Sequence, residues 1–228
     1  MKKIHWFTHA TAPNNLIKGD FFDITERELV KQIFKVLKLQ KGELVVIKSD
    51  HLGYECEISE VSRDKVTLLI LEKKQSVTQK KISLVFCIPK KDKFELILEK
   101  CTEIGITDFY PVISDRTIKT NINIERASKI IQEASEQAQR LDTPVLHTIT
   151  NLDDIFDELT PIVFDTEGTK VTSSELKEKN TFLIGPEGGF SERELDLFKE
   201  KGLEIYRIGE TVLKTETAAI VMSGILLN

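Results

Sequence analysis

Residues 181–219 read TFLIGPEGGFSERELDLFKEKGLEIYRIGETVLKTETAA, and this stretch decides the fold. It holds two short apolar segments, and each of them runs into a loop that opens a helix. The first loop, 185–189, is Gly-Pro-Glu-Gly-Gly and precedes Ser191 and Glu194, which form the capping-box pattern of a helix start. The second loop, 208–217, leads to a C-terminal helix that begins near Thr215. Two such units in succession predict an α/β fold with a ligand site built from backbone.

The glycines of the first loop explain why backbone would form the site. A glycine has no Cβ, so it lets the chain approach a ligand closely and permits positive φ, and the helix start that follows favours polar or anionic groups. The loop lacks the patterns G-x-x-x-x-G-K-[ST] and G-x-G-x-x-G, which disfavours those modes of phosphate binding. Both loops also have a plain interpretation. The first is typical of a turn, and Thr215 and Glu216 are typical of a helix cap and a first-turn acid.

The composition describes an ordinary globular protein. The chain has 228 residues, of which 40% are hydrophobic and 30% charged, and no apolar run approaches a transmembrane span. The N-terminus lacks the apolar core and cleavage site of a signal peptide, and three cysteines without C-x-x-C spacing fit neither a disulfide framework nor a zinc site. We therefore expect a cytoplasmic protein with reduced thiols, no membrane segment and no bound metal.

Charge is distributed unevenly along the chain. Residues 1–80 carry 14 Lys and Arg against 11 Asp and Glu, while the other 148 residues carry 18 against 26, within a net charge of −5. A basic N-terminal part favours a phosphate-bearing partner, with a solvated surface as the alternative.

The N-terminal third predicts a small antiparallel β-barrel with one helix packed on it. Alternating apolar and polar residues indicate half-buried strands, and one stretch, 25–39, has helical periodicity with Leu29, Ile33, Val36 and Leu37 on one face. The expected strands are 4–8, 43–48, 54–61 and 65–71, and the lysines of the helix that are candidates for RNA contact are Lys31, Lys35 and Lys38.

A polar segment, 72–80, follows and is expected to be a linker that contains the domain boundary. The predicted domains are 1–74 and 79–228. After the linker, apolar strands alternate with helices, which is the pattern of a largely parallel sheet with both faces covered. The expected strands are 82–88, 109–113, 145–148, 162–165, 181–184 and 204–207, and the expected helices are 93–104, 124–140, 153–159, one from residue 192 and one from residue 215.

A polar stripe marks the helix predicted at 124–140. Glu133, Glu136, Gln137 and Arg140 are spaced i, i+3, i+4 and i+7, which places them on one face. This spacing is typical of a solvated face with internal pairs. At the helix end, the planar guanidinium of Arg140 is also suited to bind a phosphate or a base edge. The histidines show no ligand spacing, and the sequence contains no G-x-S-x-G motif.

Five stretches carry a resemblance to a known family. They are FELILEKCTEIGI at 94–106, PVISDRT at 111–117, EASEQAQR at 133–140, IGPEGGFSERE at 184–194 and IGETVLKTETAA at 208–219. In this order they resemble the small-subunit (16S) ribosomal RNA uracil-N(3) methyltransferases of the RsmE type, in the SPOUT superfamily, and the resemblance covers essentially the whole chain. It implies a PUA-like β-barrel domain that binds RNA, followed by a trefoil-knotted α/β SPOUT methyltransferase domain that binds S-adenosylmethionine and forms a homodimer.

The resemblance also implies roles for single residues. Arg140 is expected to stabilise negative charge on the uracil oxygens, and Glu216 to accept or orient the N(3) proton. The residues expected to bind S-adenosylmethionine, chiefly through backbone, are Phe164, Thr166, Gly185, Glu187, Gly188, Gly189, Ile208, Gly209, Leu213, Thr215 and Thr217. The residues expected to bind RNA are Lys31, Lys35, Lys38, Glu136, Gln137 and Lys214. The expected substrate is a uridine of small-subunit ribosomal RNA in the assembled subunit, which must leave its helical context to reach a pocket.

Three positions depart from the family. Lys31 and Gln32 align with its usual pair of histidines, and Lys214 replaces the usual Arg, which keeps the charge but loses bidentate geometry. Two other functions stay open. One is methylation of a ribose 2′-oxygen or of transfer RNA by another enzyme of this superfamily, and the other is RNA binding by a non-catalytic assembly factor.

Overall fold

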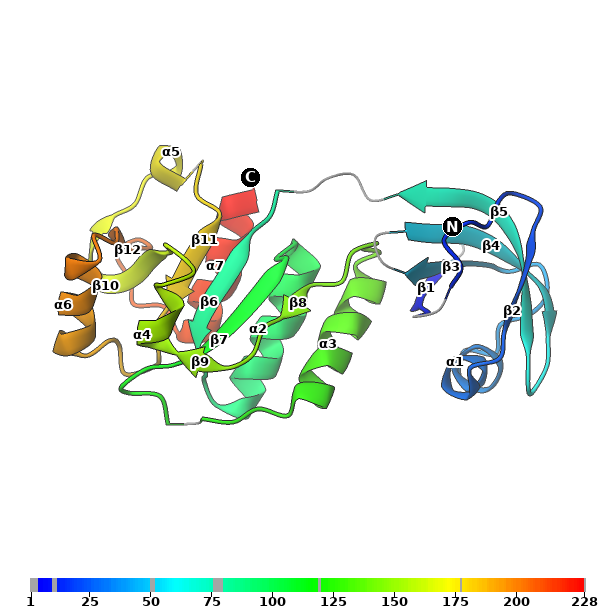
Figure 1. Cartoon of the computed structure of the whole chain (residues 1–228), viewed down its shortest axis with the longest axis horizontal. Helices are drawn as coiled ribbons and strands as arrows, with labels where there is room; N and C mark the ends of the chain where they lie inside the picture. Colours follow the sequence, from blue (N-terminus) through cyan, green and yellow to red (C-terminus); the bar gives the residue numbers. More distant parts are fainter. Residues whose placement is uncertain are drawn as a thin grey trace. The chain divides into compact units, whose positions relative to one another are not determined.

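The structure is a computed structural model that describes residues 4–9, 12–49, 52–75, 80–118, 120–176 and 178–227. Contacts divide the chain into two compact units, and Figure 1 draws both. The first comprises Met1–Gln79 and Ser135–Thr143, and the second Lys80–Ala134 and Pro144–Asn228. The domain bounds expected from the sequence stay a prediction, since residues 76–79 of the expected linker lie outside the described residues.

The first unit contains a five-stranded sheet in the order β1-β3-β4-β5-β2. Its neighbours are antiparallel except for β1 and β3, which are parallel, so the fully antiparallel prediction was wrong there. Parallel neighbours need a long crossover, and here a strand and a helix lie between the two in sequence. The strands are β1 His5–Thr8, β2 Phe21–Ile24, β3 Leu44–Ser49, β4 Leu52–Val61 and β5 Val66–Gln75.

The strand β5 extends into the segment that was expected to be a linker. Its last residues, 72–75, pair with β4, and Lys74 Nζ lies 2.8 Å from Glu55 Oε2 on the neighbouring strand. This polar end of the strand lacks the apolar alternation by which strands are recognised, so periodicity does not predict it.

The predicted helix of the first unit is shorter than expected and changes its winding. It consists of α1 Arg27–Lys31 and a π-helical turn, η1 Gln32–Val36, in which the Leu37 amide donates to the Gln32 carbonyl. Leu29 and Ile33 are buried as predicted, but Val36 is 66% exposed, because the wider π turn rotates it away from the core. The buried side chains of the helical segment and of the strands form one hydrophobic core in this unit.

The second unit is a parallel α/β sheet with helices on both faces, as predicted (Figure 1). The order is β12-β10-β11-β6-β7-β8, with β9 also paired to β7, and every pair is parallel. Strands β9 and the polar end of β10 were not predicted. The strands are β6 Ser83–Cys87, β7 Asp108–Ile113, β8 Val145–Leu146, β9 Thr150–Asn151, β10 Ile162–Lys170, β11 Thr181–Ile184 and β12 Ile205–Arg207.

Alternate residues of these strands form two separate cores. Leu84 and Phe86 of β6 face α2, α3, α5 and α7, whereas Val85 and Cys87 face α4 and α6. Such alternation on a sheet covered on both sides explains why the strands read as continuous apolar runs. The helices are α2 Lys91–Ile104, α3 Ile124–Gln137, α4 Leu152–Ile155, α5 Ser173–Leu176, α6 Glu192–Glu200 and α7 Thr215–Leu227.

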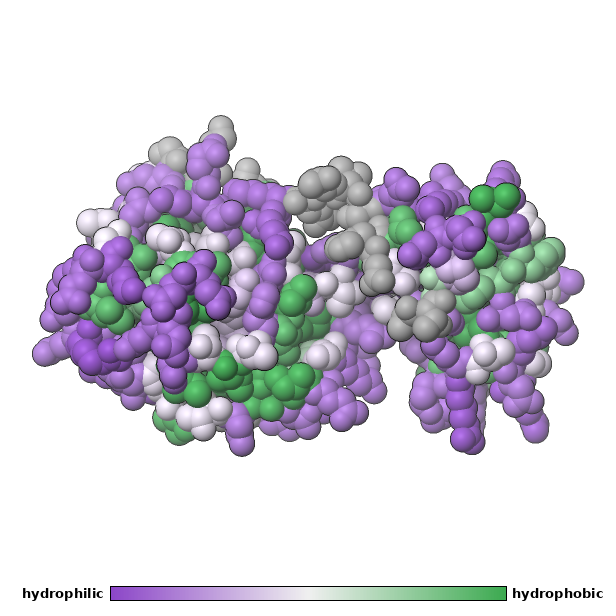
Figure 2. All heavy atoms as spheres, viewed as in Figure 1, coloured by the Kyte–Doolittle hydropathy of each residue, from purple (hydrophilic) through white to green (hydrophobic). Residues whose placement is uncertain are grey.

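The face drawn in Figure 2 is mainly hydrophilic, and hydrophobic residues gather on it in limited patches. Several apolar side chains of the second unit are exposed, among them Val221 and Ile225 on the C-terminal helix α7. In the part of the chain that the structure describes, no helix is both long and apolar enough to cross a membrane.

Candidate active site

The glycine loop, 185–190, connects β11 to α6 and is fixed at its helix end by the predicted capping box. The Glu194 amide donates to Ser191 Oγ over 3.2 Å, and the Ser191 amide donates to Glu194 Oε2 over 2.8 Å, so the prediction is confirmed. Glu194 is fully buried and also accepts the Asp115 amide at 2.8 Å. A glycine is required at 185, because a Cβ there would lie 2.8 Å from the Phe190 ring. The loop therefore starts and ends at rigid points.

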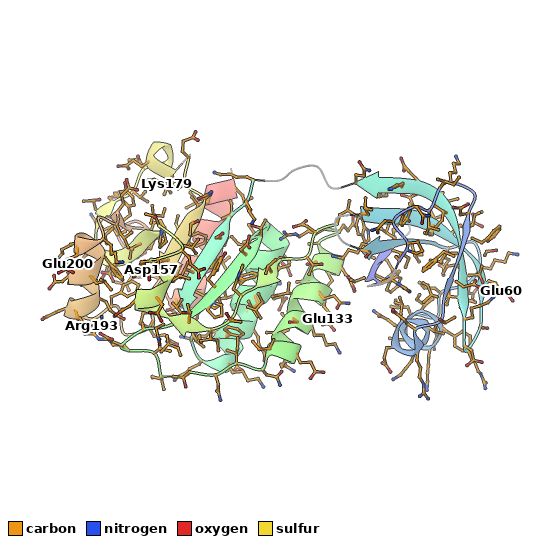
Figure 3. All side chains as sticks on the ribbon, viewed as in Figure 1. Glu60, Glu133, Asp157, Lys179, Arg193 and Glu200 are labelled. Carbon is orange, nitrogen blue, oxygen red and sulfur yellow. The ribbon has the colours of Figure 1, made fainter. Side chains whose placement is uncertain are left out.

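The loop that follows β7 holds the middle of the glycine loop. Arg116 in this loop donates from Nη1 to the Gly188 carbonyl over 2.6 Å. Its neighbour Asp115 pairs with Arg193, which lies at the start of α6 and is labelled in Figure 3. Arg193 also pairs with Asp153, at 2.8 Å. These bonds tie three separate segments to one end of the loop.

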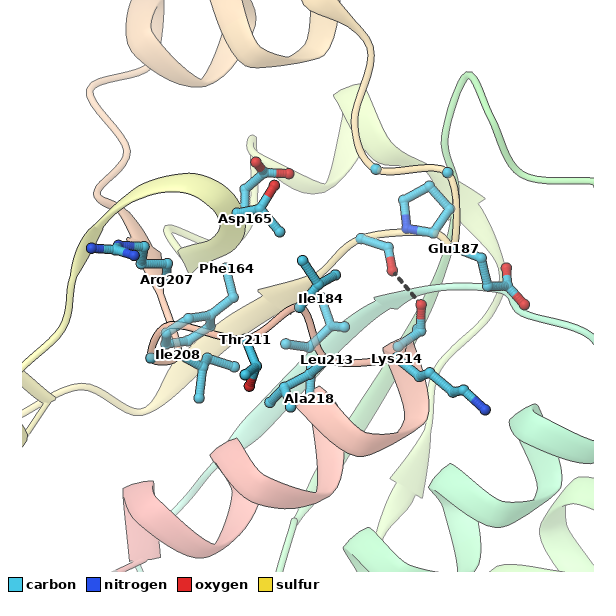
Figure 4. Close-up of a pocket in the computed structure, with 18 of the residues that line it drawn as sticks. Phe164, Asp165, Ile184, Glu187, Arg207, Ile208, Thr211, Leu213, Lys214 and Ala218 are labelled. Atoms are coloured by element: carbon cyan, nitrogen blue, oxygen red, sulfur yellow. Dashed lines mark hydrogen bonds between the residues drawn. The ribbon is translucent and has the colours of Figure 1, made fainter.

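The second predicted loop lies against the first. It runs from β12 to α7, and Gly209 within it has φ of +104°, a conformation that favours glycine. Thr215 opens α7, as the sequence predicted, and its hydroxyl donates to the Gly185 carbonyl over 3.2 Å (Figure 4). The hydroxyl of this residue therefore joins the two loops.

Together with the end of β10, the two loops enclose a cavity of about 550 Å³ (Figure 4). Phe164, Ile184, Leu213 and Ala218 give it apolar walls, while the glycine loop contributes backbone. Half of its lining residues are among those expected from the sequence to bind the cofactor: Phe164, Thr166, Gly185, Glu187, Gly188, Gly189, Ile208, Gly209, Leu213 and Thr215. Thr217 was also predicted, but it is exposed and does not line the cavity.

The sequence did not single out Lys93 or Arg207, which also line the cavity. Lys93 lies in the first turn of α2, where its Nζ is 3.2 Å from Glu187 Oε1 and 3.6 Å from Glu216 Oε2. Burial raises the pKa of the Glu187 carboxyl. Hydrogen bonds from its own amide, the Lys93 ammonium and the Lys90 amide together lower this pKa by more, so the net shift is downward. The Glu187 carboxylate is thus directed at the start of α2, while its backbone lines the cavity.

The two residues expected to be catalytic lie in different surroundings. Glu216 is on α7 in the second unit and does not line the cavity. Arg140 belongs to the first unit, is 7% exposed and pairs with Asp142. Both catalytic assignments stay predictions.

The helix predicted to extend to Arg140 ends three residues earlier. Gln139 has φ of +57°, the Gln139 amide donates to the Glu136 carbonyl, and the Arg140 amide donates to the Ser135 carbonyl, which is a Schellman motif. This turn moves Arg140 off the helical face and into a buried position. The expected polar stripe is therefore divided, with Glu133 projecting from α3 in Figure 3 and exposed, like Gln137.

Segment 135–143 packs within the first unit through polar and apolar contacts. Glu136 Oε1 accepts the Thr8 amide at 2.8 Å, and Lys48 Nζ donates to Thr143 Oγ1 at 3.1 Å. Burial lowers the pKa of Lys48 to about 8, although Glu136 and Asp142 act to raise it. Thus Glu136, predicted to bind RNA, anchors the strand β1.

The remaining residues predicted to bind RNA are exposed. Lys31, Lys35 and Lys38 lie on or directly after the helical segment of the first unit, and Phe34 between them is 38% exposed. Lys214 is exposed at the rim of the cavity. Among the residues that the structure describes, no group of His, Cys, Asp and Glu side chains is arranged to hold a metal ion.

Comparison with known proteins gives consistent matches over most of the chain. The family model described as RNA methyltransferase domain matches residues 76–227. Ribosomal RNA small subunit methyltransferase E of Helicobacter pylori strain 26695 is 31% identical over 77% of this chain and 80% of its own length. The protein of the same name from Bacillus subtilis is 29% identical over 87% of this chain and 86% of its own.

Solved structures show the same fold for both units. Ribosomal RNA small subunit methyltransferase E of Neisseria gonorrhoeae, bound to S-adenosyl methionine, has a TM-score of 0.86 at 23% identity and covers 97% of this chain and 95% of its own. A Legionella pneumophila protein in complex with the cofactor SAM has a TM-score of 0.85 at 25% identity, with 98% and 97% covered.

Proposed function

The chain belongs to the RNA methyltransferase domain family, and more narrowly to the ribosomal RNA small subunit methyltransferases E, and from this we propose that it transfers a methyl group from S-adenosylmethionine to N(3) of a uridine in small-subunit ribosomal RNA. The observation that carries the proposal is the cavity formed by the end of β10 and the two predicted loops. Its volume is in the range of sites for small organic cofactors. Solved relatives with this fold hold the same methyl donor.

The lining fits this methyl donor. Apolar walls from Phe164, Ile184, Leu213 and Ala218 suit a nucleoside ring, and the backbone of the glycine loop suits its polar edge. The donor supplies an electrophilic methyl group on a sulfonium. The chain's own residues would fix its orientation, exclude water and help remove the N(3) proton. In our proposal Glu216 acts in that proton removal and Arg140 in charge stabilisation, as the family resemblance implies.

We also propose that the first unit is a PUA-like RNA-binding domain. Lys31, Lys35 and Lys38 offer positive charge to phosphates, and the exposed ring of Phe34 offers a face on which a base can stack. Gln137 and Lys214 are further candidates for RNA contact, since both are exposed. We further propose that the second unit carries the SPOUT trefoil knot and that the enzyme acts in the cytoplasm, on the assembled small subunit.

The C-terminal helix supports the proposal of a homodimer. Val221 and Ile225 lie one turn apart on α7 and are 37% and 38% exposed, although the opposite side of the helix is buried. An apolar strip of this kind is suited to a self-complementary contact around a two-fold axis. Val221→Asp together with Ile225→Asp is expected to give a monomer in analytical ultracentrifugation, and a dimer of unchanged affinity would contradict this interface.

The experiment that tests the function is methylation of purified small ribosomal subunits with radiolabelled S-adenosylmethionine, followed by mass spectrometry of the nucleosides. The expected product is 3-methyluridine at one position. A labelled ribose 2′-oxygen, or labelling of transfer RNA instead, would support another enzyme of the superfamily. Calorimetry that finds no binding of S-adenosylmethionine would support a non-catalytic assembly factor.

A further inference from the structure

Lys93 lines the cavity, and its ammonium forms ion pairs with two carboxylates. Its Nζ lies 3.2 Å from Glu187 Oε1 on the glycine loop and 3.6 Å from Glu216 Oε2 in the first turn of α7. These two carboxylates come from the two loops that enclose the cavity. The ammonium therefore occupies a position set by both of them, which reduces the conformational freedom that an exposed lysine has.

The Glu216 carboxylate forms an ion pair with Lys93 and does not line the cavity. Its side chain is 14% exposed, its Oε2 atom is buried, and that atom has no hydrogen-bond partner among the described residues. A buried carboxylate oxygen of this kind is stabilised by a neighbouring positive charge. Lys93 is the cation within reach, so the ion pair accounts for the position of the carboxylate.

The hydrogen bond to Glu187 raises the pKa of Lys93, and the charge of Glu216 adds to this effect. The side chain is therefore an ammonium at neutral pH. An ammonium has three N–H donors. One of them is bonded to Glu187 Oε1 at 3.2 Å, and the Glu216 carboxylate forms an ion pair with the ammonium at 3.6 Å, so the ammonium keeps donor capacity for a ligand in the cavity.

The other cations at the cavity are placed differently. Arg207 Nη1 is 2.9 Å from Glu210 at the exposed rim. Lys214 is exposed, and among the described residues no carboxylate forms an ion pair with it. Lys93 is thus the cation of the cavity lining that two carboxylates orient.

We propose that Lys93 is an anion-binding residue of the methyltransferase site, whose ammonium donates a hydrogen bond to a negatively charged oxygen of a bound ligand, with Glu187 and Glu216 as the positioning residues. The inference rests on the proposed function, but it assigns to Lys93 the charge stabilisation expected of Arg140, and it gives Glu216 the positioning of Lys93 in place of removal of the N(3) proton. Two ligands of the reaction bring such an oxygen. One is the amino-acid carboxylate of S-adenosylmethionine, and the other is a uracil carbonyl oxygen that gains charge as the N(3) proton leaves.

The experiment compares Lys93→Met, Lys93→Arg and the control Lys91→Met, a lysine of the same helical turn whose side chain is 61% exposed and does not line the cavity. Calorimetry measures the binding of S-adenosylmethionine and of 5′-methylthioadenosine, which lacks the amino-acid carboxylate. Turnover is measured on purified small subunits at saturating donor. Thermal melts establish that each variant is folded, and Glu216→Gln, which leaves Lys93 in place, is a second route to the same question.

If the oxygen belongs to the donor, Lys93→Met weakens S-adenosylmethionine roughly 10- to 100-fold and leaves 5′-methylthioadenosine unchanged, as expected for a hydrogen bond to a charged group. If it belongs to the uracil, both affinities stay unchanged and turnover falls by a similar factor. In either case Lys93→Arg restores part of the loss and Glu216→Gln gives a smaller loss in the same quantity.

Lys93→Met that matches Lys91→Met in both affinities and in turnover would overturn the inference. So would an equal loss of affinity for both ligands, because a merely structural role affects them alike. The unmodified protein separates these outcomes from failure of the proposed function. If it binds no S-adenosylmethionine and methylates no subunit, the proposed function fails, whereas active protein with an unaffected Lys93→Met variant defeats this inference alone.

Discussion

The hydroxyl of Thr215 donates a hydrogen bond to the carbonyl oxygen of Gly185 over 3.2 Å, and thereby joins the two loops that enclose the cavity. Thr215→Val keeps the shape but loses this bond, so we expect the affinity for S-adenosylmethionine to fall about fivefold, as for a neutral hydrogen bond of about 1 kcal/mol. Thr215→Ser should retain the affinity. Thr217→Val is the matched control, since Thr217 is exposed on the same helix. Calorimetry measures all three, and equal affinities for the valine and serine variants would contradict the role of this bond.

Phe34 provides a test of the RNA-binding surface. Phe34→Ala should weaken binding of small-subunit ribosomal RNA by about 1–3 kcal/mol if a base stacks on the ring. The dependence of this affinity on salt should stay unchanged, because no charge is lost. Lys35→Ala should instead lower the slope of log affinity against log salt by about 0.7–0.9 per phosphate contact. Filter binding at several salt concentrations measures both, with Val36→Ala, another exposed apolar residue of this turn, as control. Equal effects of Phe34→Ala and Val36→Ala would argue against stacking.

Arg140 and Asp142 form a buried pair, so truncation of one affects folding. Arg140→Ala should lower the free energy of unfolding by about 3 kcal/mol, since it leaves the Asp142 carboxylate without its partner. Urea denaturation measures this loss. The double variant Arg140→Gln with Asp142→Asn removes both charges and should recover most of it.

Turnover of that double variant then decides the catalytic assignment of Arg140. A folded double variant that methylates small subunits at the unmodified rate would exclude a catalytic role for this residue, whereas the single variant alone cannot separate catalysis from folding.

The buried Lys48 gives the stability a pH dependence. Its pKa falls from 10.5 to about 8 on burial, so between these values the unfolded chain holds a proton that the folded chain has lost. Stability therefore rises with pH over this window, by up to about 3 kcal/mol. Urea denaturation from pH 7 to 10.5 should show the unmodified protein gaining stability relative to Lys48→Met. A difference between the two that does not change with pH would contradict the lowered pKa.

Gly168 is required for the pairing of β10 with β12. A Cβ at this position would lie 2.5 Å from the Tyr206 carbonyl carbon, and backbone atoms cannot rotate away. Gly168→Ala should therefore cost about 3 kcal/mol or more of stability. Gly202→Ala, which has a positive φ but no neighbour within 4 Å, should cost only about 1–2 kcal/mol of backbone strain. Thermal denaturation compares them, and similar losses for both would exclude the close contact as the cause.

Local patterns in the sequence predicted much of the second unit. The apolar strand 181–184 and the capping box at Ser191 and Glu194 were found where they were expected, because both depend on neighbours within a few residues. Half of the residues that line the cavity were also predicted, since loops after neighbouring parallel strands meet at one edge of a sheet.

Features that depend on distant residues were not predictable in this way. Lys93 reads as one of several lysines at a helix start, and its pairing with Glu187 and Glu216 arises only when three loops meet. Arg140 was placed on a helical face, but a positive φ at Gln139 turns it inward, and a glutamine gives no signal for that conformation. The polar end of β5 is supported by the pair between Lys74 and Glu55 on another strand, which periodicity does not reveal.

The first unit is assembled from two separate parts of the chain, since segment 135–143 packs with residues near the N-terminus. Leu141 lies so close to Gly53 that a Cβ at 53 would meet it at 2.4 Å, and Glu136 holds the Thr8 amide. During synthesis, the ribosome must add 64 residues beyond position 79 before this unit has all of its parts, which takes about 3–13 s. Throughout that interval the nascent sheet lacks the segment that covers Gly53. The N-terminal unit is therefore completed only after much of the methyltransferase sequence has been made.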